Sequence, residues 1–287
     1  MTTPSTSSPS ISSPSTSSPS TSSPGRHQQQ WYRPMVSPEH GVYVMLGVSF
    51  LIGAAAAQQW TGATTLALLC AYCGFQAEHP LVLQIRQRRS WKLRFLVWAG
   101  IYSGIAIAIA TWLFWQKQQH WPLLAIYSTA LVAILIDSLS VWQRQQKSVG
   151  NELVTFAAAC LAAPLAYTAT TGTLSWSAIG LWILNTLFFS SAIFTVKLRK
   201  VRTASILSGL IFHAVATGIL VLLWQMHWLS LLTAAAFGVA LLKFGLIVWQ
   251  KDWYCDAKIQ RVAVLETAAS LLFFAIAALS VLPPYLN

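Results

Sequence analysis

Two glutamate and histidine pairs are the first candidates for chemistry in this sequence. Glu39 and His40 form one pair in SPEHGVYV, and Glu78 and His79 form the other in QAEHPLVL. Such groups are scarce, because the 287 residues include only 7 acidic residues and 6 histidines. Helix ends tolerate charge, and Glu39 also suits a helix N-terminus, but the repetition of the pair indicates the rim of a polar cavity. We therefore take all four residues as candidate catalytic residues.

Three more ionisable residues interrupt or border apolar stretches and complete this set, namely Asp137, Glu152 and His213. An ionisable group inside hydrocarbon costs about 2.5 to 3.5 kcal/mol on insertion scales, so it usually faces a bundle interior or a wet cavity. His213 has two readings, an interhelical hydrogen-bonding group or a functional ligand or base. The candidate substrate-binding residues are Arg144, Asn185, Lys197, Arg199, Lys243 and Glu266.

Two of these groups suggest specific partners. Asp137 and Arg144 are seven residues apart, which on one continuous helix places both on the same face, where they bracket a polar cavity or stabilise the helix end. Lys243 either extends its ammonium group to the interface or pairs with Glu266 on the following helix.

No metal site or cofactor is predicted. The spacing of the His, Asp and Glu residues matches no ligand motif, and the Cys70 and Cys73 pair has no second pair to complete a four-ligand site.

Long apolar runs must position these residues. The chain is 55% hydrophobic and 9% charged, whereas charged residues make up about a quarter of a soluble domain. A helix needs about 17 to 25 apolar residues to cross the bilayer. The sequence therefore predicts an all-α polytopic bundle of nine transmembrane helices, at 42–57, 61–84, 93–115, 121–142, 152–171, 175–196, 204–224, 228–249 and 262–283.

The basic residues predict the orientation of this bundle. Of the 18 lysines and arginines, all but Lys117 and Lys243 fall in the tail or in every second connection. Because Lys and Arg stay with cytoplasmic loops, the N-terminus is predicted to be cytoplasmic and the C-terminus outside. The net charge of +11 thus indicates contact with anionic lipid and no nucleic acid. We expect a bacterial inner membrane or another internal membrane.

Two regions differ in composition. Residues 1–30 are rich in Ser, Thr and Pro, which predicts a disordered cytoplasmic tail, and residues 31–287 form the transmembrane domain.

All seven acids lie on the predicted cytoplasmic side, which insertion rules do not explain because Asp and Glu contribute little to topology. This predicts a cytoplasm-facing polar cavity that binds an amphiphilic or anionic lipid-like substrate. A secondary transporter that uses the same cavity and a non-catalytic assembly or scaffold subunit remain alternatives. Protein partners and oligomeric state are open.

Several segments resemble the YwiC-like family of bacterial multi-pass membrane proteins. They are PEHGVYVMLGVSFLIG, NELVTFAAACLAAPLAYTATTG, FFSSAIFTVKLR and RVAVLETAAS. The resemblance implies a polytopic membrane protein and no particular reaction.

The chain is more distantly similar to UbiA-type prenyltransferases, through Pro164, Tyr167, Thr171 and Gly172 at the end of the fifth span. That similarity implies nine helices, a cytoplasmic-side cavity and an isoprenoid-like amphiphile. The aspartate-rich motifs of those enzymes are absent, since the corresponding places read AEHPLVLQIRQRR and TVKLRKVR. Mg²⁺-dependent prenyl transfer is therefore not expected, and enzymatic activity stays open. Direct binding of an anionic headgroup is predicted for Lys197, Arg199, Lys200 and Arg202.

Overall fold

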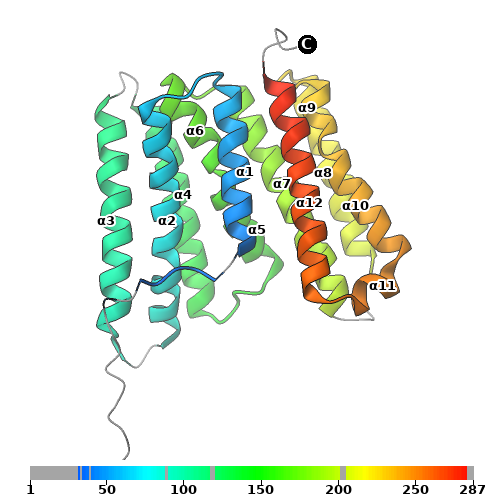
Figure 1. The fold of residues 1–287 in the computed structure, drawn as a ribbon, viewed down its shortest axis with the longest axis horizontal. Coiled ribbons are helices and arrows are strands. Elements are labelled where there is room, and N and C mark those ends of the chain that lie inside the picture. The colour runs from blue at the N-terminus through cyan, green and yellow to red at the C-terminus, as the bar shows by residue number, and fades with distance from the viewer. Residues whose placement is uncertain are drawn as a thin grey trace, which may run out of the picture. The chain divides into compact units, whose positions relative to one another are not determined.

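A computed structural model describes residues 32, 34–38, 40–87, 90–116, 120–200 and 205–282. The predicted tail at 1–30 and Glu39 lie outside these residues. All regular secondary structure in the described residues is helical, which confirms the all-α prediction (Figure 1). The helices are α1 His40–Ala56, α2 Gly62–Gln87, α3 Leu93–Gln116, α4 Trp121–Trp142, α5 Val149–Cys160, α6 Ala162–Thr171, α7 Trp176–Lys200, α8 Leu207–Gln225, α9 Leu231–Ala235, α10 Gly238–Trp249, α11 Lys251–Asp256 and α12 Ile259–Val281.

Eight helical segments in the described residues have the length and apolar composition needed to cross a membrane. Two of them are built from consecutive helices, α5 with α6 over Val149–Thr171 and α9 with α10 over Leu231–Trp249. The first predicted span corresponds to α1, which has 17 residues and is therefore about 25 Å long, shorter than the hydrocarbon layer. The count of nine and the side of each terminus stay predictions.

Local chemistry explains where several helices begin and end. Ser148 precedes α5, and its side chain accepts a hydrogen bond from the backbone N–H of Asn151. Pro164 lies in the first turn of α6, where its missing N–H interrupts the ladder that would otherwise join α5 and α6 into one helix. Gly172 ends α6 with a φ of 81°, a conformation that a residue without a Cβ adopts easily.

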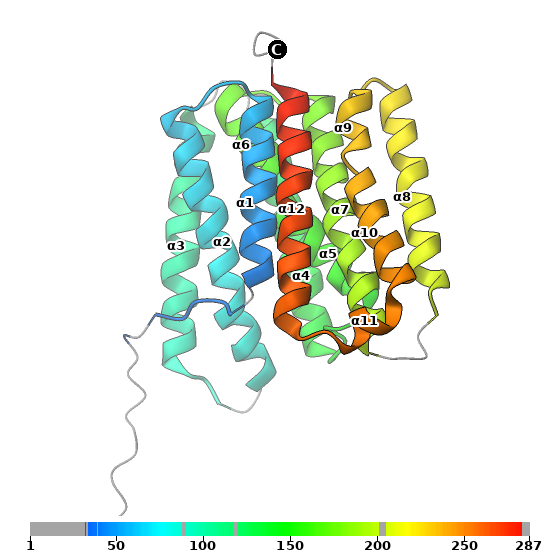
Figure 2. The same cartoon turned by 45° about the vertical axis from the view of Figure 1, so that its right-hand side comes forward.

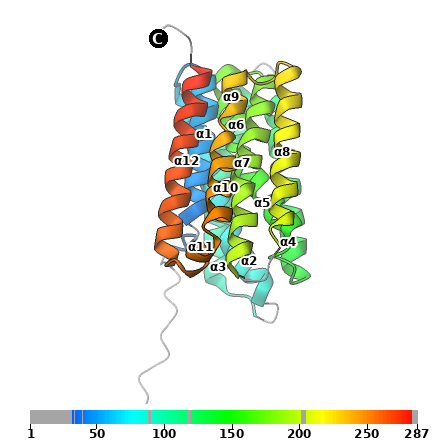
Figure 3. The same ribbon diagram turned by 90° about the vertical axis from the view of Figure 1, so that its right-hand side faces the viewer.

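The helices run roughly along one axis (Figure 3). Apolar side chains fill the interior between them and also cover much of the outer surface. Inside, the rings of Phe188 and Phe273 stack at 3.9 Å between α7 and α12. Gly53 of α1 lies against the backbone of Ala163, so close that a Cβ there would be 2.1 Å from the Ala163 carbonyl oxygen. Outside, α3, α4 and α8 expose many large apolar side chains, as helices that face lipid do.

The ends of the helices place the polar residues. α2, α4 and α7 end, and α5 and α12 begin, at the same end of the bundle, the lower end in Figure 2. This is the end to which the basic connections are attached and which the sequence predicts to be cytoplasmic. We call it the inner end.

Candidate binding cavity

A half-open cavity of about 600 Å³ lies at the inner end, among residues of α2, α4, α5, α7 and the connection between α4 and α5. We call it the first cavity. Its charged and imidazole-bearing wall includes Glu78, His79, Arg86, Asp137, Lys147, Glu152 and Lys197. The structure therefore brings together five of the residues singled out from sequence, on four different helices. Whether they act on a substrate stays a prediction.

Asp137 and Asn151 form the most enclosed polar contact of this cavity. Asp137 is 8% exposed, and its Oδ1 accepts a 2.7 Å hydrogen bond from Nδ2 of Asn151. The same Nδ2 group also donates to the backbone carbonyl of Gln146 at 3.3 Å. These bonds fix the last turns of α4 to the first turn of α5, so that the Asp137 carboxylate is held in one place in the wall.

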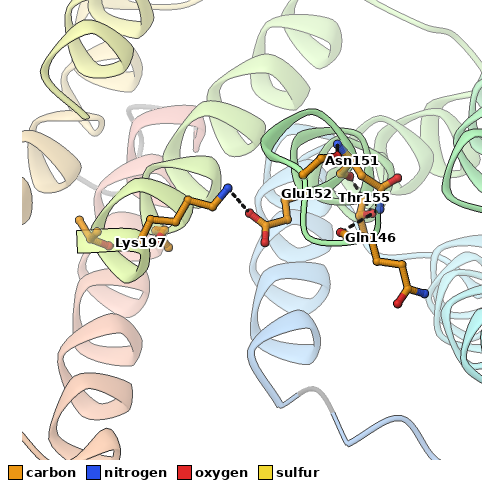
Figure 4. Close-up of polar contacts among 8 residues, drawn as sticks. Gln146, Asn151, Glu152, Thr155 and Lys197 are labelled. Carbon is orange, nitrogen blue, oxygen red and sulfur yellow. Dashed lines mark hydrogen bonds and ion pairs between the residues drawn. The ribbon is translucent and has the colours of Figure 1, made fainter. Parts of the chain in front are cut away.

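Glu152 and Lys197 form an ion pair across the cavity edge. Lys197 extends from α7 toward α5, and its Nζ lies 3.1 Å from Oε2 of Glu152 (Figure 4). Glu152 is in the first turn of α5, where the helix dipole favours a negative charge. The side chain of Lys197 is 33% exposed and that of Glu152 is 26% exposed, so the pair is within reach of water and of a bound molecule.

The rest of the first cavity is apolar. Val82, Phe156, Ile193 and Val196 contribute hydrocarbon or aromatic surface beside the charged groups. A cavity with one charged region and one apolar region suits a molecule that has a polar end and an apolar end.

A second cavity of about 410 Å³ adjoins the first, and Arg86, Gln146 and Lys147 line both. Arg144 lines only the second. The expectation that Arg144 shares a helix face with Asp137 is wrong, because α4 ends at Trp142. Arg144 instead lies in the following turn with a φ of 62°, which directs the chain away from the helix axis.

A separate polar group is buried among α8, α10 and α12. Nζ of Lys243 donates a 2.8 Å hydrogen bond to Oε2 of Glu266, which confirms the pairing expected from sequence. Lys243 is 4% exposed and lies over the Phe188 ring. Nearby, His213 is 3% exposed, stacks on Phe244 at 4.2 Å, and has its Nδ1 2.7 Å from the Gly209 carbonyl oxygen.

Asn185, Arg199 and His40 also line neither cavity. Oδ1 of Asn185 accepts a 3.3 Å hydrogen bond from Ser49, which joins α7 to α1. Arg199 donates to the carbonyl oxygen of Ala257, at the end of α11. His40 is exposed at the start of α1.

The sequence predicted one cavity that contains all of these groups. The prediction of a single cavity is wrong in extent, because helix packing separates the groups. Glu78, His79, Asp137, Glu152 and Lys197 line the first cavity, whereas His213, Lys243 and Glu266 lie outside both cavities.

Beside Arg199, Tyr254 of α11 is fully buried. Burial raises the pKa of its phenol, so the group stays neutral at neutral pH.

Sequence reasoning missed Asn151, Gln146 and Thr155 of the first cavity. Asn151 is 14 residues from Asp137, a separation that signals nothing until the turn after α4 brings the two together. Ser148 offered an indirect signal, since a serine before an apolar run marks a helix start and Asn151 then falls in the first turn.

No three His, Cys, Asp or Glu side chains in the described residues are grouped so that they could hold a metal ion. The expectation of no metal and no cofactor stays a prediction.

Comparison with known proteins supports the resemblance found in the sequence. The model of the family described as YwiC-like protein matches residues 36–167, which include α1 to α5 and the two motifs PEHGVYV and NELVTFAAAC. No curated protein and no solved structure matches the chain, and the similarity to UbiA-type prenyltransferases stays a prediction. The chain is a multi-pass integral membrane protein, and residues 36–167 are similar to the family described as YwiC-like protein.

Proposed function

We propose that this protein binds an amphiphilic, lipid-like molecule taken from the inner leaflet, with the polar end of that molecule in the first cavity. The cavity volume of about 600 Å³ lies within the usual range of about 300 to 1,000 Å³ for small-molecule sites. The membrane is then a bacterial inner membrane or another internal membrane, with the inner end facing the cytoplasm.

One observation carries this proposal, namely that one cavity at a helix end joins an apolar wall to charged groups of both signs. Asp137 and Glu152 supply carboxylates, and Lys197 supplies an ammonium group at the edge. Phe156 and Ile193 offer the surface that an apolar tail needs. A site for a small hydrophilic solute gains little from that surface, whereas an amphiphile uses both parts.

Filling the cavity tests the proposal without removing any charge. We expect Ala192→Trp, in the wall, to abolish retention of co-purified amphiphile, measured by native mass spectrometry of the full chain released from membrane. Val82→Trp, from the opposite wall, should do the same. Val215→Trp is the matched control, because Val215 is 56% exposed on α8 and outside the cavity. Retention by both cavity variants at the control's level would contradict the proposal.

A proton-coupled secondary transporter is the second candidate, and a different observation supports it. The Lys243 and Glu266 pair, with His213 nearby, lies in membrane-length helices, where ionisable residues often serve ion or proton pathways. Proteoliposomes loaded at one pH and diluted into another would report solute flux driven by a proton gradient. Flux that is lost in Glu266→Gln and kept in Ala192→Trp would favour transport over amphiphile binding.

A non-catalytic scaffold should instead tolerate the removal of these carboxylate charges. If the polar groups serve only packing, Asp137→Asn and Glu152→Gln should leave every activity and ligand unchanged as long as the fold is kept. A change of amphiphile retention in either folded variant would exclude the scaffold reading.

A further inference from the structure

We propose that the second cavity is a phosphate site, which holds a phosphate group at the polar end of the amphiphile. This inference rests on the proposed function and names the class of headgroup. The shared chemistry is a phosphate monoester or free phosphate, which at pH 7 carries a charge of about −1.5 to −2. The experiment below separates these two sources.

All charged residues that line the second cavity are positively charged. Arg86, Arg144 and Lys147 line it with Gln146 and Val141, and no carboxylate of the described residues does. The first cavity differs, because carboxylates also line it and its Lys197 is paired with Glu152 at 3.1 Å. Three cations that line one pocket repel one another, and an anion between them removes that repulsion.

The anion site therefore lies elsewhere than the sequence suggested. The carboxylate of Glu152 neutralises Lys197, and Arg199 donates to the carbonyl oxygen of Ala257 and lines neither cavity. Arg202, which follows them, lies outside the described residues. Arg86 and Arg144 line the same cavity because α2 and α4 both end at the inner end.

The turn that carries Arg144 is fixed by its own backbone bonds. The N–H of Arg144 donates to the Val141 carbonyl oxygen at 3.1 Å, and the N–H of Gln145 donates to Ser140 at 2.8 Å. These bonds hold Arg144 at a φ of 62°, in the left-handed region that non-glycine residues seldom occupy. This is the left-handed turn with which helices commonly end, as at His227 after α8, and it sets the direction in which Arg144 leaves α4.

A phosphate fits these groups better than a carboxylate does. Each guanidinium group presents parallel N–H donors that match two oxygens of one phosphate, and an ammonium group adds a further donor. Two guanidinium groups and one ammonium group, as supplied here by Arg86, Arg144 and Lys147, can bind several oxygens of a dianion.

Continuity of the two cavities links this site to the amphiphile. Arg86, Gln146 and Lys147 line both, so one molecule can place its phosphate in the second cavity and its adjoining polar and apolar parts in the first.

The test uses the full-length protein in detergent and isothermal titration with three probes, dihexanoyl phosphatidic acid, dihexanoylglycerol and inorganic phosphate. We expect the phosphatidic acid to bind, dihexanoylglycerol to bind at least about tenfold more weakly, and inorganic phosphate to compete with the phosphatidic acid, since charge-assisted bonds contribute about 1.5 to 3 kcal/mol each. Arg144→Gln should weaken binding of the phosphatidic acid at least about tenfold for the same reason.

Arg261→Gln is the matched control, since Arg261 is exposed at the start of α12 and lines neither cavity. Because an exposed charge contributes little, Arg261→Gln should change affinity by less than about twofold. If Arg144→Gln fails to fold, the double variant Arg86→Gln with Lys147→Gln gives the same test. An equal loss in Arg261→Gln would show non-specific surface attraction and overturn the inference.

The remaining outcomes separate the two proposals. Equal binding of dihexanoylglycerol and phosphatidic acid would overturn the phosphate site and leave amphiphile binding intact. Binding of inorganic phosphate, lost in Arg144→Gln, without binding of either lipid would support a site for free phosphate and contradict the proposed function.

Discussion

Glu152 of α5 and Lys197 of α7 lie 3.1 Å apart at the edge of the first cavity, and both are partly exposed. An ion pair with this exposure contributes about 0 to 1 kcal/mol to stability, so its role in folding is small. Its position gives it a larger effect on binding, because the carboxylate competes with any anionic ligand for the ammonium group.

We therefore expect opposite effects from the two halves of this pair. Glu152→Gln should strengthen retention of an anionic amphiphile, since it frees Lys197, and Lys197→Gln should weaken it. Neither should change the free energy of unfolding by more than about 1 kcal/mol. Titration with dihexanoyl phosphatidic acid and unfolding in mixed micelles measure the two quantities. Equal weakening of binding by both substitutions would argue against competition for Lys197.

The pair of Lys243 and Glu266 should behave differently because its ammonium group is buried, with the Lys243 side chain 3% exposed and that of Glu266 24% exposed. Lys243→Met should lower the free energy of unfolding by more than the roughly 1 kcal/mol of an exposed pair, since it leaves the Glu266 carboxylate without its counter-charge. Lys243→Met combined with Glu266→Leu should recover most of this loss, because no buried charge then remains.

Unfolding in mixed micelles checks this second prediction, with Lys258→Met as control because Lys258 is exposed. If Lys243→Met alone were as stable as this control, the ion pair with Glu266 would contribute nothing measurable to the free energy of unfolding.

Two glycines of α1 give a matched test of the helix packing. Gly53→Ala should destabilise the fold by about 1 to 3 kcal/mol or more, because the new Cβ meets the backbone of Ala163. Gly47→Ala, on the same helix, has nothing within 4 Å of its added Cβ and should leave stability unchanged or slightly higher. Thermal unfolding of the purified variants would measure both, and equal melting temperatures would refute the close contact of α1 with α6.

The sequence predicted the parts of this structure that depend on local pattern. Apolar runs of bilayer length are helical in the structure, and the pairing of Lys243 with Glu266 was one of the two alternatives that the sequence left open for Lys243. The cavity was predicted less well. A turn after Trp142 moves Arg144 off the helix face of Asp137 and brings in Asn151. Such contacts depend on how the chain leaves a helix, which residue spacing does not encode.

The orientation of the bundle also has a direct test. We expect a cysteine at Ser90, between α2 and α3, to react with an impermeant maleimide only when the cytoplasmic side is open, because basic connections stay inside. A cysteine at Thr173, between α6 and α7, should react from outside. Both positions are exposed, and the four native cysteines would first be replaced by alanine. The reverse pattern would place the first cavity on the outer side.

Occupancy of the first cavity would be visible in a structure of the protein determined in nanodiscs cut from its native membrane. We expect density for an amphiphile whose apolar part lies beside Phe156 and Ile193 and whose polar end reaches Lys147. A closed inner end, with lipid bound only around the outer surface of α3, α4 and α8, would contradict it.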